Sequence, residues 1–151
     1  MKISMTAPVE RVFLDTNVLV YPYDRSEPEK QRRARALLAR LAAAQAGVVS
    51  AQVLAEFFVT VTRKLAAPLP VASAVEQLAC HLRLWKVVDV TGILVAEAAA
   101  AAHKHRLNYW DAQVWAAARL NQVSVVLSED FSHGAEIDGV RFVNPFVEDF
   151  R

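Results

Sequence analysis

Short apolar runs alternate with longer stretches of helical periodicity along the whole chain, and this alternation constrains the fold more than any other feature of the sequence. Strands are predicted at residues 12–14, 47–50, 87–90, 124–127 and 141–143. Helices are predicted at residues 27–45, 51–65, 71–85, 93–105 and 109–121, with Ser50 and Asn108 placed to cap two of them. Strands that alternate with helices form βαβ units. The predicted fold class is therefore α/β, with a central, mostly parallel sheet flanked by helices on both faces.

Length, charge and composition narrow the class of protein further. With 151 residues, 54% of them hydrophobic, we expect a single domain over residues 1–151 with its core at about 11–146. A formal net charge of +1 gives no strong field for nucleic acid or for an anionic membrane. Residues 1–10 lack the apolar core of a signal peptide, no stretch has the ~20 apolar residues of a membrane span, and Cys80 is the only cysteine. These features predict a cytoplasmic protein with no membrane partner.

Four acidic residues lie where an apolar segment meets a turn or a helix: Asp15, Glu56, Asp111 and Asp130. Ligands of open α/β sheets bind beyond the carboxyl ends of the strands, which is where Asp15 lies. Glu56 lies inside the apolar segment 53–59, where an unpaired buried carboxylate is costly. Each acid also has an ordinary alternative, as a turn or helix cap or as a helix-surface charge. Because carboxylate oxygens suit hard cations, the four together indicate a site for a divalent metal.

Other common sites are disfavoured by the sequence. The four glycines are all isolated, so neither a dinucleotide fingerprint nor a phosphate-binding P-loop is present. No group of Cys and His residues has the spacing of a zinc site. The acids therefore remain the strongest indication of chemistry.

Four segments in order along the chain resemble the signature segments of the PIN-domain ribonucleases, and in particular of the VapC toxins of type II toxin-antitoxin pairs. These segments are FLDTNVL at 13–19, SAQVLAEF at 50–57, NYWDA at 108–112 and LSEDF at 127–131. The resemblance implies a PIN-like three-layer fold, cleavage of RNA with Mg²⁺ or Mn²⁺, a homodimer, and inhibition by a cognate antitoxin.

The resemblance also implies roles for individual residues. It makes Asp15, Glu56, Asp111 and Asp130 the metal-binding and catalytic acids, with Asp15 and Asp111 holding the metal most directly. It places Thr16, Asn17 and Ser128 at polar positions that support the site. Glu129, directly beside Asp130, competes with it for the fourth acidic role.

The expected function is that of a metal-dependent endoribonuclease toxin, in which a metal-activated water attacks the scissile phosphorus and leaves a 5′-phosphate and a 3′-hydroxyl. Two alternatives remain open at this point: a catalytically silent PIN-fold binding module, and a phosphohydrolase of the haloacid-dehalogenase type.

Basic and aromatic residues near the acids are the remaining candidates for contact with RNA. The basic candidates are Arg32, Arg33, Lys104 and Arg106, against the alternative of an ordinary solvated basic face. The aromatic residues Phe57, Phe58, Trp110 and Trp115 recur at helical spacing within apolar segments. We therefore predict that these four are core residues and not platforms for bases.

Overall fold

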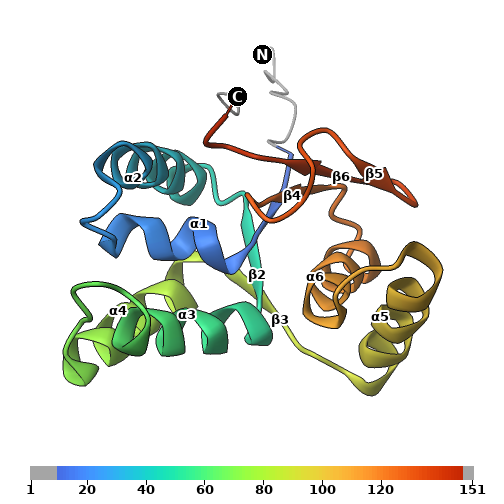
Figure 1. Ribbon diagram of the computed structural model, residues 1–151, viewed down its shortest axis with the longest axis horizontal. Coiled ribbons are helices and arrows are strands. Elements are labelled where there is room, and N and C mark those ends of the chain that lie inside the picture. The colour runs from blue at the N-terminus through green and yellow to red at the C-terminus, as the bar shows by residue number, and fades with distance from the viewer. Residues whose placement is uncertain (1–9, 148–151) are drawn as a thin grey trace, which may run out of the picture.

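Six strands form one sheet with helices packed against both of its faces (Figure 1). The structure is a computed structural model that describes residues 10–147, so the segment 1–9, to which the signal-peptide prediction refers, lies outside it. The strand order is β3-β2-β1-β4-β6-β5. The strands are β1 (Val12–Leu14), β2 (Gly47–Ser50), β3 (Lys86–Val88), β4 (Val125–Leu127), β5 (Glu136–Ile137) and β6 (Val140–Val143). Neighbouring strands run parallel except β5 and β6, which are antiparallel.

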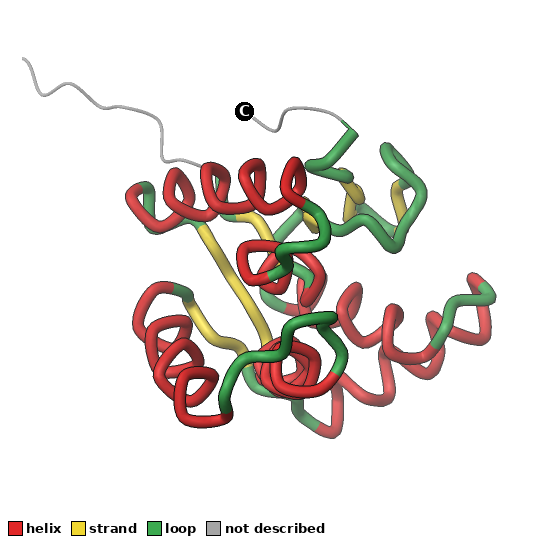
Figure 2. The backbone as a smooth tube through the Cα atoms, turned by 60° about the vertical axis from the view of Figure 1, so that its left-hand side comes forward, coloured by secondary structure: helices red, strands yellow, loops and turns green. Residues whose placement is uncertain are grey.

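The helices form two layers. They are α1 (Thr16–Val20), α2 (Pro28–Ala43), α3 (Ala51–Arg63), α4 (Val71–Leu84), α5 (Gly92–His105) and α6 (Tyr109–Leu120), with a 3₁₀ turn η1 (Tyr21–Tyr23) after α1. In Figure 1, α1 to α4 lie on one side of the sheet, and α5 and α6 lie on the other. Figure 2, turned by 60°, again shows the strands between helices. The predicted mostly parallel sheet with helices on both faces is confirmed. Among the helices of residues 10–147, none has the length and apolar character needed to cross a bilayer.

Buried strands and side-chain caps explain why these segments fold as they do. Every residue of β1 and β4 is buried, as expected for parallel strands that are covered on both faces. The Ser50 hydroxyl accepts a hydrogen bond from the Val53 backbone amide at 3.2 Å, and the side-chain Oδ1 of Asn108 accepts one from the Trp110 backbone amide at 2.9 Å. Both predicted caps are confirmed. They fix where α3 and α6 begin, and so they set the positions of the acids on these helices.

The C-terminal hairpin differs from the prediction, which contained no strand between residues 127 and 141. β5 and β6 are joined through Asp138 and Gly139, whose φ angles are +46° and +85°. An Asp-Gly pair with positive φ at both residues is typical of a two-residue hairpin turn, so the sequence did contain a signal for it. The third strand also begins one residue earlier than expected, at Lys86.

Gly47 in β2 lies directly beneath the ring of Trp85, and we expect Gly47→Ala to lower the free energy of unfolding by about 1–3 kcal/mol. A Cβ at this position would lie 2.3 Å from Cε3 of Trp85. The ring has little room to move, because Trp85 is 5% exposed and its Nε1 donates to Nδ1 of His81 at 2.9 Å. Urea unfolding measures the change, with Gly92→Ala as the control, since a Cβ at Gly92 meets nothing within 4 Å. Equal losses in the two variants would contradict the close approach.

Candidate functional site

Asp15 lies at the carboxyl end of β1, and strand register gives it its closest partner. Leu14 pairs with Leu127 in the neighbouring parallel strand β4, so the next residues, Asp15 and Ser128, lie side by side. The Ser128 hydroxyl donates to Oδ2 of Asp15 at 2.7 Å, and the Thr16 amide donates to Oδ1 at 2.7 Å. Asp15 is only 4% exposed. Burial raises its pKa from 3.8 to about 7 against the lowering effect of these two hydrogen bonds, and the charges of Asp130 and Asp111 add to the rise.

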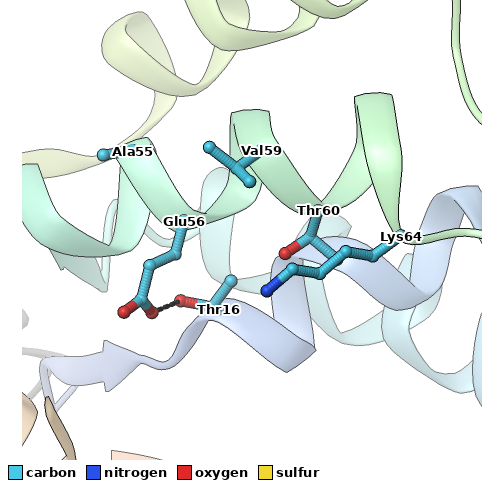
Figure 3. Close-up of a pocket in the computed structure, with 6 residues that line it drawn as sticks. All are labelled: Thr16, Ala55, Glu56, Val59, Thr60 and Lys64. Carbon is cyan, nitrogen blue, oxygen red and sulfur yellow. Dashed lines mark hydrogen bonds between the residues drawn. The ribbon is translucent and has the colours of Figure 1, made fainter.

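Glu56 projects from α3 towards the start of α1. Its Oε2 accepts a hydrogen bond from the Thr16 hydroxyl at 2.9 Å (Figure 3). Its Oε1 accepts one from the side-chain amide of Gln52 at 3.2 Å. The side chain is half-buried, so the apolar segment around it in the sequence does not enclose it. Thr16 therefore links the two acids, because its backbone amide binds Asp15 and its hydroxyl binds Glu56.

A chain of side-chain amides, which the sequence did not reveal, connects α3 to α6. The Gln52 amide also donates to the Trp110 carbonyl at 3.2 Å, and Gln113 donates to the Gln52 carbonyl oxygen at 2.9 Å. The Tyr109 hydroxyl completes the chain by donating to Gln113 at 2.8 Å. Gln52 and Gln113 are both buried. Glu56 is thus held relative to the first turn of α6, where Asp111 lies. The one-turn spacing of Gln52 and Glu56 was the available signal.

Asp111 and Asp130 complete the set of acids. Burial raises the pKa of Asp111, and the charges of Asp130 and Glu56 raise it further. The Asp130 amide donates to the Ser128 hydroxyl at 3.0 Å, which places the exposed Asp130 beside the end of β4. Asp111 and Asp130 therefore lie within electrostatic reach of Asp15, and Asp130 and Glu56 lie within reach of Asp111.

Glu129, the competing candidate for the fourth acid, points to a different part of the molecule. Its carboxylate binds the Lys30 ammonium at 3.0 Å and also accepts a hydrogen bond from the Tyr21 hydroxyl. It contributes to neither of the raised aspartate pKa values, whereas Asp130 contributes to both. Geometry favours Asp130 as the fourth member of the cluster.

The supporting residues predicted from the sequence lie next to the acids. Asn17 donates from Nδ2 to the Ser128 hydroxyl at 3.3 Å and accepts from the Glu129 amide at 3.3 Å. Thr16 and Ser128 bind the acids directly, as described above. Together these hydrogen bonds fix the loop that follows β4 against the start of α1.

The donor set suits a hard divalent cation. All four acids offer carboxylate oxygens, and the buried Asp15 carries a charge that has no cationic partner among residues 10–147. Within that same range, no three His, Cys, Asp or Glu side chains stand around one point as a ready ligand cage. Mg²⁺ does not require such a cage, since it usually keeps several waters and binds one or two carboxylates. The acids therefore fit the metal that the sequence led us to expect.

The basic residues predicted to contact RNA occupy two regions. On α2, Arg32 pairs with Glu29, and Arg33 donates to the Phe146 carbonyl at 3.0 Å. Lys104 and Arg106 are exposed at the end of α5, just before α6. Contact of these four residues with RNA stays a prediction.

Two hollows lie on either side of Glu56. One, of about 400 Å³, is lined by Thr16, Ala55, Glu56, Val59, Thr60 and Lys64 (Figure 3). The other, of about 500 Å³, is more apolar and includes Trp110 among its lining residues. Trp110 is 57% exposed, so the prediction that it is a core residue is wrong: it lies in the first turn of α6 and lines this hollow. Phe57 and Trp115 are buried and Phe58 is partly buried, as predicted.

The sequence matches the model of a known protein family. The model of the PIN domain matches residues 12–134, which include all four acids, and the chain belongs to the PIN-domain family. This assigns it to a family other than the haloacid dehalogenases. Among curated proteins, no sequence matches the chain significantly.

Solved structures with the same fold come from toxin-antitoxin systems. A chain of a toxin-antitoxin complex from Klebsiella pneumoniae is 18% identical and has a TM-score of 0.65, with 89% of this chain and 97% of that chain covered. VapC20 from Mycobacterium tuberculosis, a sarcin-ricin loop cleaving toxin, is 21% identical with a TM-score of 0.60, covering 76% of this chain and 86% of that one. A chain of DNA-bound VapBC from Salmonella typhimurium is 16% identical with a TM-score of 0.61, covering 89% and 97%. At these identities the similarity establishes the fold.

Proposed function

We propose that this protein is a metal-dependent endoribonuclease that acts as the toxin of a type II toxin-antitoxin pair. The observation that carries the proposal is the convergence of Asp15, Glu56, Asp111 and Asp130, from four separate segments, at the edge where β1 and β4 end. Such a concentration of carboxylates is unfavourable unless a cation shares the site, and a nuclease of phosphodiesters uses such a cation. Membership of the PIN-domain family supports the same activity.

Each residue of the site has a separate part in the proposed reaction. Asp15 and Asp111 would hold Mg²⁺ or Mn²⁺ most directly, and Glu56 and Asp130 would complete the set. When bound, the ion would lower the pKa of a water and offset the charge of the phosphate. Ser128 and the Thr16 amide keep the Asp15 carboxylate in a fixed orientation, and Gln52 and the Thr16 hydroxyl do so for Glu56. No protein nucleophile is required, so the products should carry a 5′-phosphate and a 3′-hydroxyl.

A protein antitoxin and a second copy of this chain are the proposed partners. The solved structures with this fold include chains of toxin-antitoxin complexes, which supports the first. Exposed apolar side chains lie along one face of α4, at Val71, Val75 and Leu82. Their spacing corresponds to a single helix face, and such a face is typical of a protein interface.

We expect the purified protein to cleave a mixed RNA pool with Mg²⁺ or Mn²⁺ and to stop when the metal is chelated. Because even residues that only support metal ligands affect activity by about 10- to 100-fold, Asp111→Asn and Asp130→Asn should each lower the cleavage rate by at least about 100-fold. Glu129→Gln is the matched control and should retain most activity, since Glu129 binds Lys30 instead of facing the acids. The rates are measured on gels with copurified antitoxin removed.

Three outcomes would contradict this proposal. Cleavage that resists chelation would exclude the metal, and 2′,3′-cyclic phosphate ends would exclude attack by water. Absence of cleavage by the parent chain, with antitoxin excluded and a broad RNA pool, would favour a catalytically silent PIN-fold binding module.

A further inference from the structure

Polar side chains recur at every fourth residue along one face of α3. They are Gln52, Glu56, Thr60 and Lys64. Residues at this spacing lie above one another on a helix surface. The first two belong to the site described above. Thr60 and Lys64 lie one and two turns beyond Glu56 and have no part in the proposed chemistry so far.

Thr60 and Lys64 line the hollow of about 400 Å³ beside Glu56. Figure 3 shows the Lys64 side chain extending back over Thr60, with its ammonium directed towards Thr16 and Glu56. Within residues 10–147, neither the Thr60 hydroxyl nor the Lys64 ammonium has a hydrogen-bond or ion-pair partner. The hollow therefore presents two unoccupied hydrogen-bond donors, one of them cationic, at the side of the acid cluster.

Three basic residues of α2 have donors engaged within the protein. Lys30 binds Glu129, Arg33 donates to the Phe146 carbonyl, and Arg35 donates to the Pro22 carbonyl at 2.9 Å. Glu56, the carboxylate nearest to Lys64 along this face, is instead bound by Thr16 and Gln52. Lys64 thus remains available for an anion that is not part of the protein.

An anionic polymer that approaches four carboxylates needs a compensating cation close to them, because the net charge of +1 supplies little attraction. We propose that Thr60 and Lys64 bind a phosphate of the RNA backbone next to the scissile one, with Lys64 as the positioning cation. The inference rests on the proposed ribonuclease function and extends it, because it assigns the direction in which the RNA strand leaves the acids: along α3, past Thr60.

Lys64 could also act only by stabilising the C-terminus of α3. A substitution of Arg63 distinguishes that role from phosphate binding. Lys64 is the C-terminal capping residue of α3, where a positive charge favours the helix dipole. Arg63 occupies the last turn of the same helix, is exposed, and does not line the hollow. Arg63→Gln therefore removes the same charge and the same dipole interaction without removing a phosphate ligand.

The test measures binding apart from cleavage. Fluorescence anisotropy gives the Kd of a labelled single-stranded RNA for Asp15→Asn protein, with and without Lys64→Gln, Lys64→Arg or Arg63→Gln, at about 50 to 200 mM salt. Loss of one charged hydrogen bond to a phosphate predicts about a tenfold rise in Kd for Lys64→Gln. The slope of log Kd against log salt should fall by about 0.7, the contribution of one phosphate of a single strand. Lys64→Arg and Arg63→Gln should each leave both the Kd and the salt slope unchanged.

Cleavage kinetics in the active chain give the second readout. Lys64→Gln should raise KM and leave kcat within about twofold, because the lost contact is present before and during the reaction. Equal effects of Lys64→Gln and Arg63→Gln, or an unchanged salt slope, would overturn the phosphate site while leaving the nuclease intact. A parent chain that cuts no RNA, together with a Lys64-specific loss of binding, would overturn the nuclease and leave the phosphate site standing.

Discussion

Asp15→Asn is expected to abolish RNA cleavage and, in the absence of divalent metal, to make the protein more stable. The carboxylate is 4% exposed, and burial raises its pKa to about 7, so at pH 8 the native state carries a buried charge without a cation. Asparagine has nearly the same shape and can still accept from the Thr16 amide. The substitution therefore removes the charge and keeps this hydrogen bond, at the loss of the one from Ser128.

The size of this gain in stability and its pH range follow from the pKa of Asp15 in the unfolded chain, 3.8, and in the native state, about 7. Between pH 3.8 and about 7 the native state binds a proton that the unfolded chain has lost, so the parent gains stability as the pH falls through this range. The full cost of the charge, about 4 kcal/mol, is present above pH 7, and we expect Asp15→Asn to recover about 2–4 kcal/mol at pH 8. The gain should shrink towards zero near pH 4. Cleavage should fall by at least about 100-fold.

Urea unfolding at several pH values, with chelator present, measures this effect. Asp89→Asn is the matched control, because Asp89 is an exposed aspartate outside the acid cluster, and its stability curve should follow that of the parent. Added Mg²⁺ should stabilise the parent and not Asp15→Asn, because only the parent retains the ligand. A variant that is inactive and also less stable than the parent at pH 8 would show that Asp15 serves mainly to hold the fold.

His81 should make the protein lose stability as the pH falls below 6.5. His81 lies on α4, its imidazole is buried against Tyr23, Phe57 and Trp85, and burial lowers its pKa from 6.5 to about 4. The native state therefore keeps His81 neutral, whereas the unfolded chain takes up a proton. Stability from this residue is complete above pH 6.5 and is lost between pH 6.5 and about 4, by about 3 kcal/mol in total.

A variant is needed to isolate this contribution, because Asp15 changes stability in the opposite direction over an overlapping pH range, and the raised pKa of Asp111 acts in the same direction as that of Asp15. In His81→Gln the side-chain oxygen can still accept from Nε1 of Trp85, which lies 2.9 Å from Nδ1 in the parent. The difference in unfolding free energy between parent and variant should shrink by about 3 kcal/mol as the pH is lowered from 7.5 to 4.5. A difference that does not change with pH would mean that His81 is protonated inside the native protein.

The sequence predicted most of the helices and strands because they depend on local patterns. Continuous apolar runs indicated β1 and β4, and the caps Ser50 and Asn108 marked the starts of α3 and α6. Contacts that depend on strand register were beyond this reasoning. The hydrogen bond from Ser128 to Asp15 exists because Leu14 pairs with Leu127, and nothing local in either segment specifies that register.

One error in the prediction and two questions that it left open have physical causes. Trp110 has the helical spacing of a core residue, but periodicity does not reveal that its ring lines a surface hollow while the neighbouring Tyr109 packs against the core. Glu129 and Asp130 are neighbours with the same charge, and only the position of Lys30 on α2 separates their roles. Lys64 belongs to no motif in the sequence. Its proposed role in binding a phosphate follows only from its place on the face of α3 that carries Glu56.

The exposed Trp110 provides the protein with an optical reporter. Trp85 and Trp115 are 5% and 3% exposed, so their emission should be that of indoles in an apolar interior, whereas Trp110 at 57% should emit at longer wavelength and be open to soluble quenchers. Its carbonyl is bound by Gln52, which also holds Glu56, and the next residue is Asp111. The indole ring lines the hollow of about 500 Å³ that also contains Glu56. Selective quenching of the long-wavelength emission can therefore follow metal or RNA binding in the unlabelled protein before any target sequence is known.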